Sequence, residues 1–304
     1  TVGVLIDGCP AGIALSTDDF MADLQRRRSG GVGSTRRKES DIPIIKSGVY
    51  ENHTTGSPIL IEFENLNTRS ADYNKLKNIP RPGHADFTAS KKFEGFNDPR
   101  GGGAFSGRLT VGLVATGVIA KKIIGAINIK AELIEVGGES DIESAVLKVV
   151  KAKDSIGGII ECRAENLPVG LGEPFFDSVE SCISHAIFSI PGIKGIEFGS
   201  GFEAARMKGS EHNDPIIDIE GKTSTNNAGG INGGISNGND LFFRVAVKPT
   251  SSIGLPQKTI NLKSWKPEEL IVGGRHDSCF ALRVPVIVEA VTACVLADFS
   301  LIGL

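Results

Sequence analysis

A stretch of thirty residues, 81–110, gathers side chains that could bind an anion beside an ionisable group. It contains one histidine, His84, together with three arginines, three carboxylates and a glycine triplet at 101–103. Glycines lack a Cβ atom and let backbone N–H groups approach a ligand closely. The run that follows, 105–121, predicts a helix whose N-terminus favours negative charge. The stretch therefore predicts a site that holds a phosphate or carboxylate next to an imidazole.

Two short basic runs precede this stretch. Arg26, Arg27 and Arg28 close an expected helix that begins near Asp18, and a second run follows at 36–38. One interpretation is a solvated helix end, because basic side chains there complement the helix dipole. The other is an anion pocket, since planar guanidinium groups bind carboxylates and phosphates through paired hydrogen bonds. Nucleic-acid binding ranks third, because aromatic residues make up 6% of the chain and none interleaves with these arginines.

The composition is that of a soluble globular protein. The 304 residues are 40% hydrophobic and 23% charged, and the net charge is −3. No apolar run approaches the roughly 20 residues that span a bilayer, so we expect no membrane insertion. The acidic balance disfavours a nucleic-acid-binding surface. Five scattered cysteines, an odd number, indicate buried thiols in a reducing compartment, and we therefore expect a cytoplasmic protein.

Glycine is abundant and clustered. The 38 glycines gather at 101–103, 192–201, 221–238 and 273–274. Each cluster taken alone is typical of an ordinary turn. Together, beside charged or amide residues, the clusters favour several loops that converge on a ligand.

Hydrophobic periodicity predicts a mixture of strands and helices. Strands are expected at 2–6, 42–50, 59–64, 123–136, 158–164, 241–247 and 259–262. Besides 105–121, helices are expected at 18–28, 141–153, 177–190 and 279–301. Because strands and helices do not alternate regularly, mixed α+β layers are favoured over a doubly wound sheet. No linker divides the chain, so residues 1–304 are expected to form a single domain.

Three familiar motifs fail when their spacing is checked. Residues 220–223 end like a phosphate-binding P-loop, but Ile216 stands where the first glycine is required. Residues 196–204 resemble a dinucleotide fingerprint, but 208–210 interrupt the helix that should follow. The cysteines and histidines lack zinc-ligand spacing, so we expect no metal site.

A series of motifs in a fixed order carries a family resemblance. With the arginine run 26–28, the series comprises DGCPAG at 7–12, TTGSP at 54–58, RPGHAD at 81–86, RGGG at 100–103, NAGGI at 227–231, KPTSS at 248–252 and GRHD at 274–277. On these motifs the chain resembles chorismate synthase along almost its whole length.

The resemblance implies a lyase that converts 5-enolpyruvylshikimate 3-phosphate to chorismate and phosphate by a 1,4-anti elimination. The family uses reduced FMN without net redox change, and a transient electron from the flavin would help to expel phosphate before the ring hydrogen is lost. The resemblance also implies a β-α-β sandwich of antiparallel sheets with outer helices, and a homotetramer. Nothing in the sequence suggests flavin reductase activity, so we expect reduced FMN to come from an external reductant.

The same resemblance assigns roles to residues. His84 matches the histidine near the flavin, where a protonated imidazole would stabilise the anionic reduced ring. Asp277 matches the carboxylate that helps to take the substrate proton through flavin N5, and Ser106 is a third catalytic candidate. Contacts to FMN are expected from Ala104, Phe105, Ser106, Pro191, Gly192, Gly233, Lys248, Pro249, Thr250, Ser251, Ser252 and Arg275. Arg27, Arg37 and Arg108 are the candidates for the substrate, which carries two carboxylates and a phosphate.

Departures from the family pattern leave a second interpretation open. The family usually carries a GESHG-like segment before the first strand, whereas this sequence begins at Thr1, so we expect a missing N-terminal segment. Ala104 stands where the family places a polar flavin contact, and the stretches 28–37 and 72–81 are short. The alternative function is that of a catalytically impaired relative that binds FMN or anions.

Overall fold

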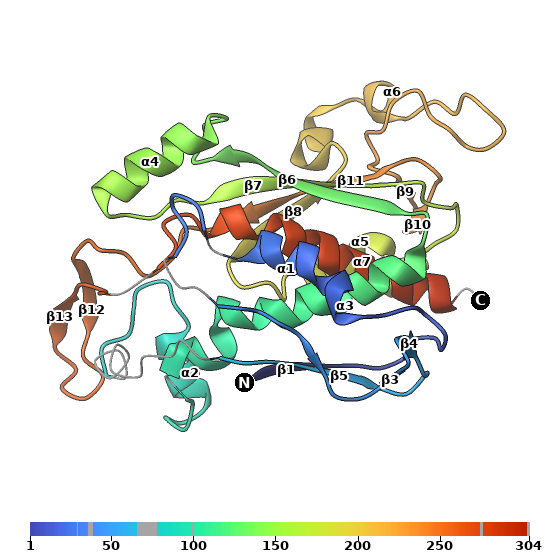
Figure 1. Cartoon of the computed structure of the whole chain (residues 1–304). Coiled ribbons are helices and arrows are strands. Elements are labelled where there is room, and N and C mark those ends of the chain that lie inside the picture. The colour runs from blue at the N-terminus through green and yellow to red at the C-terminus, as the bar shows by residue number, and fades with distance from the viewer. Residues whose placement is uncertain (29, 36–38, 66–77, 99, 274–275, 303–304) are drawn as a thin grey trace.

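Two antiparallel sheets enclose a layer of helices (Figure 1). The computed structural model describes residues 1–28, 30–35, 39–65, 78–98, 100–273 and 276–302. The smaller sheet has the strand order β1-β5-β2, formed by Val2–Ile6, Ile59–Phe63 and Ile44–Ile45. The larger sheet has the order β6-β7-β11-β8, formed by Asn128–Val136, Gly158–Glu165, Leu241–Val247 and Ile193–Phe198.

The middle layer contains α1 (Met21–Arg27), α3 (Thr110–Ile124) and α7 (Pro285–Ile302). α3 packs on α7 and β1, and α7 also contacts β6 and β7. Most residues of α3 and α7 are apolar and many are buried, so these helices must pack against other elements on several sides. This arrangement confirms the α+β fold with a β-α-β order of layers. The expected outer position holds for α4 (Ile142–Ala152), which lies beyond the larger sheet, but not for α3 and α7.

The strands of both sheets turn one face toward the helical layer. β5 alternates buried and half-buried residues along its length, and β7 alternates in the same way up to its exposed end. Period-two alternation is the pattern of a sheet that packs on one side. The main hydrophobic core accordingly joins residues of both sheets and of the helices between them.

Shorter elements complete the described fold. Two-stranded sheets pair β3 with β4, β9 with β10 and β12 with β13, whose strands are Val49–Tyr50, His53–Thr54, Ile231–Asn232, Ile235–Ser236, Gln257–Ile260 and Pro267–Leu270. The other α-helices are α2 (Asp86–Lys92), α5 (Val179–Ile187) and α6 (Gly209–His212). Short 3-10 helices occur at Thr17–Phe20, Arg100–Phe105, Gly107–Leu109, Phe175–Asp177, Gly201–Arg206 and Phe280–Arg283.

The helix expected at 105–121 is displaced along the chain, to Thr110–Ile124. Two short 3-10 helices come first, and the hydroxyl of Ser106 caps the second by accepting a hydrogen bond from the backbone amide two residues on, at 3.2 Å. The glycine triplet is therefore not followed directly by an α-helix N-terminus. Because the helix also ends later than expected, the strand expected at 123–136 begins only at Asn128.

Local signals also shift other boundaries. The helix expected at 177–190 begins at Val179, because the hydroxyl of Ser178 supplies its N-cap. The strand expected at 42–50 divides into β2 and β3, and the break contains Gly48 with φ +79°. A positive φ of this kind interrupts an extended strand and favours glycine.

α7 is long and apolar enough to cross a membrane, by length and composition alone. In the structure 56% of it is buried, and it contacts α3, α5 and the larger sheet. A core helix enclosed by other elements shows the same composition. The position of α7 between the sheets therefore accounts for its apolar sequence.

Gly117 sets how closely α3 approaches α7. A Cβ atom at this position would collide with the Cα and Cβ atoms of Ala290. Gly117→Ala is therefore expected to lower the unfolding free energy by about 1–3 kcal/mol through overpacking. Urea unfolding would measure the loss, with Gly209→Ala as a control because open space surrounds that glycine. Equal midpoints for wild type and Gly117→Ala would contradict the close approach.

Candidate functional site

A cavity of about 740 Å³ collects residues from segments far apart in the sequence. The sequence-predicted residues that line it are Arg27, His84, Ala104, Phe105, Ser106, Arg108, Pro191, Gly192, Lys248, Pro249, Thr250, Ser251, Ser252 and Asp277. The fold thus brings basic, hydroxyl, carboxylate and imidazole side chains to a single cavity.

The segment that carries His84 is a tight turn. Pro82 occupies its second position, Gly83 its third with φ +71°, and the His84 amide donates to the Arg81 carbonyl at 3.2 Å. Proline followed by a glycine with positive φ is the signature of a type II turn. The turn places the His84 side chain beside Arg81, immediately before α2.

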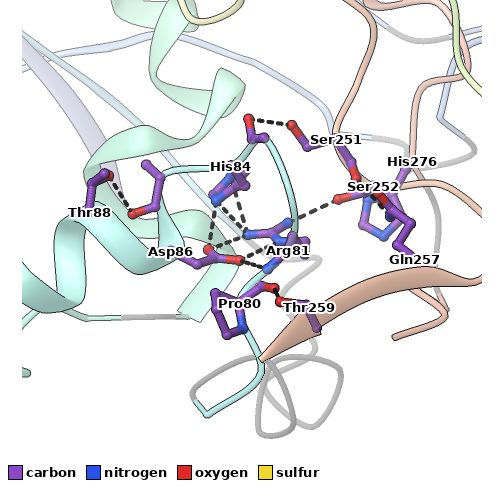
Figure 2. A network of polar contacts seen from close by, with 12 residues as sticks. Pro80, Arg81, His84, Asp86, Thr88, Ser251, Ser252, Gln257, Thr259 and His276 are labelled. Atoms are coloured by element: carbon purple, nitrogen blue, oxygen red, sulfur yellow. Dashed lines mark hydrogen bonds and ion pairs between the residues drawn. The ribbon is translucent and has the colours of Figure 1, made fainter. Parts of the chain in front are cut away.

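Arg81 organises a polar network at this turn (Figure 2). Its Nε donates to Oδ2 of Asp86 and its Nη2 donates to Oδ1, both at 2.8 Å. Its Nη1 donates to Oγ of Ser252 at 3.0 Å. Arg81 is only 7% exposed, so a paired carboxylate is needed to offset the burial of its charge. The network ties the turn to the loop 248–252.

The carboxyl of Asp86 makes the stability of this network depend on pH. Burial alone would raise its pKa, but hydrogen bonds from Arg81 and His84 outweigh burial and hold the pKa well below its usual range. Because the pKa is lower in the folded than in the unfolded protein, the stabilisation is complete above the unfolded value of about 3.9 and is lost as pH falls below it.

Asp86→Asn should therefore be less stable than wild type near neutral pH, and the difference should shrink as pH falls below about 4. Urea unfolding of both proteins between about pH 7 and about pH 3 would measure this difference. A difference in unfolding free energy that stays constant with pH would contradict the lowered pKa.

The loop 248–252 follows β11 and folds onto the turn. Nζ of Lys248 donates to the Gly83 carbonyl at 3.0 Å and to Oγ of Ser251 at 2.8 Å. Burial lowers the pKa of the Lys248 ammonium. Oγ1 of Thr250 is buried and has no hydrogen-bond partner among the described residues. The loop therefore offers an ammonium and a hydroxyl to a polar ligand.

Arg27 and Arg108 share one buried carboxylate. Nη2 of Arg27 lies 2.5 Å from Oδ2 of Asp41, and Arg108 pairs with Oδ1 of the same residue. Arg27 and Asp41 are 2% and 1% exposed, and desolvation lowers the pKa of Arg27 to about 10 even though Asp41 acts in the opposite direction. Within the described chain, Nε of each arginine is buried without a partner. Donors thus remain for an anionic ligand.

Arg26, the next arginine in the run, serves the core instead. Its Nη1 and Nη2 donate to the two carboxylate oxygens of Glu289 on α7, each at 2.7 Å. Glu289 also accepts from Nζ of Lys121 at 3.1 Å and from the Ala131 amide at 3.0 Å. Arg26 is thus held by a core carboxylate rather than by solvent alone, while Arg27 and Arg28 line the cavity, where an anion pocket stays a prediction.

Asp277 is held in the cavity wall by two contacts. Its Oδ1 accepts from the Thr35 amide at 2.7 Å, and its Oδ2 accepts from Nη1 of Arg283 at 3.2 Å. Arg283 also donates through Nε to the Arg27 carbonyl at 2.8 Å. Segments from both ends of the chain therefore orient this carboxylate.

The comparison with known protein families identifies the family to which these residues belong. A family model described as chorismate synthase matches residues 1–301. The chain belongs to the chorismate synthase family. Members of this family are lyases, so the predicted enzyme class is confirmed.

Individual relatives agree with this assignment. The chorismate synthase of Chitinophaga pinensis is 64% identical over 303 residues, which cover 99% of this chain and 91% of the relative. That of Dehalococcoides mccartyi is 44% identical over 332 residues, with the same coverage. A crystal structure of a chorismate synthase superposes with a TM-score of 0.75 at 25% identity, covering 99% of this chain and 88% of the solved one.

Of the residues expected from the family resemblance, one described residue, Gly233, lies away from the cavity. Gly233 and Gly234, with φ +63° and +89°, form the two-residue turn between β9 and β10, a turn type that requires positive φ at both positions. Gly233 does not line the cavity of this chain. Arg37 and Arg275 lie outside the described residues.

The glycine clusters serve different purposes. Gly102 and Gly192 line the cavity, as expected for loops that converge on a ligand. Gly199 has φ +54°, and a Cβ atom there would collide with the Asn227 carbonyl. Gly199, in the dinucleotide-like stretch 196–204, therefore lets two loops pack together. The expectation that each glycine cluster converges on the cavity is wrong for this glycine.

Two carboxylates that orient the site, Asp86 and Asp41, were not among the predicted site residues. Asp86 carried a usable signal, because it follows His84 by two residues within the RPGHAD motif and stands at the start of a helix. Asp41 carried none. Its backbone φ is +46°, which no local sequence pattern indicates. Its partners Arg27 and Arg108 come from other segments of the chain.

Proposed function

We propose that this chain converts 5-enolpyruvylshikimate 3-phosphate to chorismate and phosphate by a 1,4-anti elimination that requires reduced FMN. The proposal is carried by the convergence of family-expected residues on one cavity with both cationic and ionisable side chains. It rests further on membership in the chorismate synthase family and on relatives that bear that name.

The substrate has two carboxylates and a phosphate, and the arginines of the cavity can bind them. At an effective dielectric constant near 20, a charge pair at 4 Å contributes about 4 kcal/mol before desolvation. Asp41 holds Arg27 and Arg108 in place and leaves their Nε donors unpartnered within the described chain. Guanidinium groups fixed in this way bind an anion with little further loss of side-chain freedom.

The residues of the cavity also fit FMN. The Lys248 ammonium and the unpartnered Thr250 hydroxyl suit the phosphate and hydroxyls of its ribityl chain. Residues 104–106 and 191–192 also line the cavity, and Phe105 contributes an aromatic ring. When bound, reduced FMN supplies a transient electron that assists the departure of phosphate without net redox change.

The protein contributes the binding groups and the control of protons. His84 presents an imidazole to the cavity, and Asp277 presents a carboxylate for the proton that the substrate ring loses. Ser106 adds a hydroxyl, although its Oγ already accepts a hydrogen bond from the Arg108 amide. Because the side chains that orient these groups are already hydrogen-bonded, they need little rearrangement when the ligands arrive.

Lys248→Ala is expected to weaken FMN binding by roughly 10- to 100-fold, since a hydrogen bond to a charged group contributes about 1.5–3 kcal/mol. Quenching of flavin fluorescence would measure the dissociation constant. Lys258→Ala, on an exposed position of β12, is the matched control and should bind FMN as wild type does. Equal affinities for the two variants would exclude Lys248 as a contact of the flavin.

We also propose that the chain forms one domain and assembles as a homotetramer. The main core takes residues from both sheets, which supports a single folding unit. Several large apolar side chains are well exposed, namely Phe175, Phe176, Phe202, Ile216, Ile217 and Ile219, and would be covered at an interface between copies. Light scattering after gel filtration would measure the molar mass and test the assembly.

We place the enzyme in the cytoplasm, with an external reductant for its flavin and no nucleic-acid or membrane partner. The free thiols of Cys9, Cys162 and Cys279 are buried, and burial raises the pKa of each. Such thiols fit a reducing compartment.

The proposed function is tested by anaerobic phosphate release from 5-enolpyruvylshikimate 3-phosphate by the full gene product with photoreduced FMN. Oxidised FMN is the control. Release with reduced flavin alone supports the proposal. A protein that binds FMN and releases no phosphate is the catalytically impaired relative instead, and the lyase proposal then fails.

A further inference from the structure

We propose that Asp86 and Arg81 are positioning residues that hold the neutral His84 ring in the tautomer with the proton on Nδ1. The proton that His84 exchanges during turnover then enters and leaves at Nε2. This functional consequence rests on the proposed function, whereas the tautomer itself is a property of the protein without ligand.

The contact with Asp86 decides where the ring proton lies. Nδ1 of His84 is 2.6 Å from Oδ1 of Asp86. An ionised carboxylate has only acceptor sites, so a hydrogen bond of this length requires a proton on Nδ1. In the neutral imidazole the other nitrogen, Nε2, then carries a lone pair.

Arg81 contacts both ring nitrogens and is compatible with the same tautomer. Its Nη2 lies 3.2 Å from Nε2 of His84 and 3.0 Å from Nδ1 (Figure 2). A guanidinium has donors and no acceptor, so it can donate only to a ring nitrogen with a lone pair. With Nδ1 bonded to Asp86, that nitrogen is Nε2. The carboxylate therefore selects one arrangement of the ring, and the guanidinium can donate to the lone pair that this arrangement leaves on Nε2.

The carboxylate itself is fixed from several directions. Oδ2 of Asp86 accepts from Nε and from the backbone amide of Arg81, at 2.8 and 3.0 Å. Oδ1 accepts from Nη2 of Arg81, which leaves the remaining lone-pair direction of Oδ1 for His84. Nη1 of Arg81 is anchored on Ser252 in the loop that we assign to FMN. The ring orientation is thus coupled to the wall of the cavity.

Asp86→Asn would reverse the preference. An asparagine can place only one oxygen in this network, and two donors of Arg81 already meet at the Oδ2 position. Its amide nitrogen would then face Nδ1 of His84 as a donor. A ring nitrogen that accepts a hydrogen bond cannot carry the proton, so the proton would move to Nε2.

The tautomer can be measured without ligand by 15N–1H correlation spectra of protein labelled with 15N-histidine, at a pH where the ring is neutral. His84→Gln identifies the signal. In wild type we expect the Nδ1 resonance at the position of a protonated ring nitrogen and the Nε2 resonance at that of an unprotonated one. The reverse pattern in wild type overturns the proposal, whether or not any variant folds.

Kinetics test the consequence of the tautomer. Asp86→Asn is expected to lower kcat by about 10²-fold or more, with KM little changed, because proton transfer is impaired and binding is not. Asp141→Asn, at the N-cap of α4 where asparagine caps equally well, is the matched control for both measurements. An Asp86→Asn protein with an unchanged tautomer or an unchanged kcat contradicts the positioning role.

The two proposals fail in distinguishable ways. If the Nδ1-protonated tautomer is found but wild type releases no phosphate, the proposed function fails and the assignment of the ring proton stands. If wild type releases phosphate with His84 protonated on Nε2, the lyase function stands and the positioning role is wrong.

Discussion

Replacing His84 with alanine is expected to slow phosphate release by about 10²- to 10⁴-fold, the range that a positioned proton-transferring side chain contributes. His84 lines the cavity, and its side chain is 20% exposed. The truncation leaves the ion pair between Arg81 and Asp86 intact, so the loss of one hydrogen bond should cost stability only about 1 kcal/mol. Anaerobic turnover with reduced FMN, together with urea unfolding, would separate these two effects.

His185→Ala provides the matched control, because His185 is exposed on α5 and does not line the cavity. It should turn over as wild type does. Unchanged turnover of His84→Ala would remove His84 from the mechanism. A loss that appears together with a strongly lowered unfolding midpoint would show that the effect is one of folding.

The turn around His84 was predictable from sequence because its signals are local. Pro82 and Gly83 specify the turn type, and the turn alone sets His84 beside Arg81. The same holds for α4, where Asp141 caps the helix and Lys153 ends it in a left-handed conformation. Short-range chemistry therefore predicted the bounds of one helix, and it is also sufficient to specify the turn that positions one site residue.

The layer order depended on contacts that periodicity cannot reveal. An apolar helix pattern predicts that the helix is buried, but it does not indicate which other elements pack against the helix. For α3 the answer lies partly in Gly112 and Gly117, whose missing side chains leave room for Val4 of β1 and Ala290 of α7. These partners are more than a hundred residues away in sequence, so the family resemblance was needed to expect the sandwich.

The cavity residues also divide into those that local sequence patterns predict and those whose roles depend on contacts between distant segments. The motifs predicted a large part of the cavity lining, since each motif is a local stretch with recognisable residues. Other ion pairs that orient the lining involve residues outside those motifs, such as Asp41 and Arg283. Their roles follow from burial and from the charges they meet, and both are properties of the folded chain.

Removal of the Asp41 carboxylate is expected to destabilise the protein strongly. Asp41→Ala would leave Arg27, which is 2% exposed, as a buried charge without its counter-ion. Breaking a buried pair from one side costs about 3–5 kcal/mol, because the remaining charge has lost its water and its partner. Urea unfolding at neutral pH would measure the loss, and a cost below about 1 kcal/mol would contradict the buried pair.

Glu289→Ala is the control that isolates burial of the surviving charge. Glu289 is buried as deeply as Asp41, but its partners Arg26 and Lys121 have side chains that are 45% and 28% exposed and can turn to water. Its removal should therefore cost less, about 1–3 kcal/mol. The double variant Arg27→Ala with Asp41→Ala should be less destabilised than the sum of its single changes, because the deeply buried Arg27 charge is removed together with its counter-ion and the remaining Arg108 side chain is 13% exposed. If the two effects simply add, Asp41 acts through packing alone, and the arginines of the cavity do not depend on it.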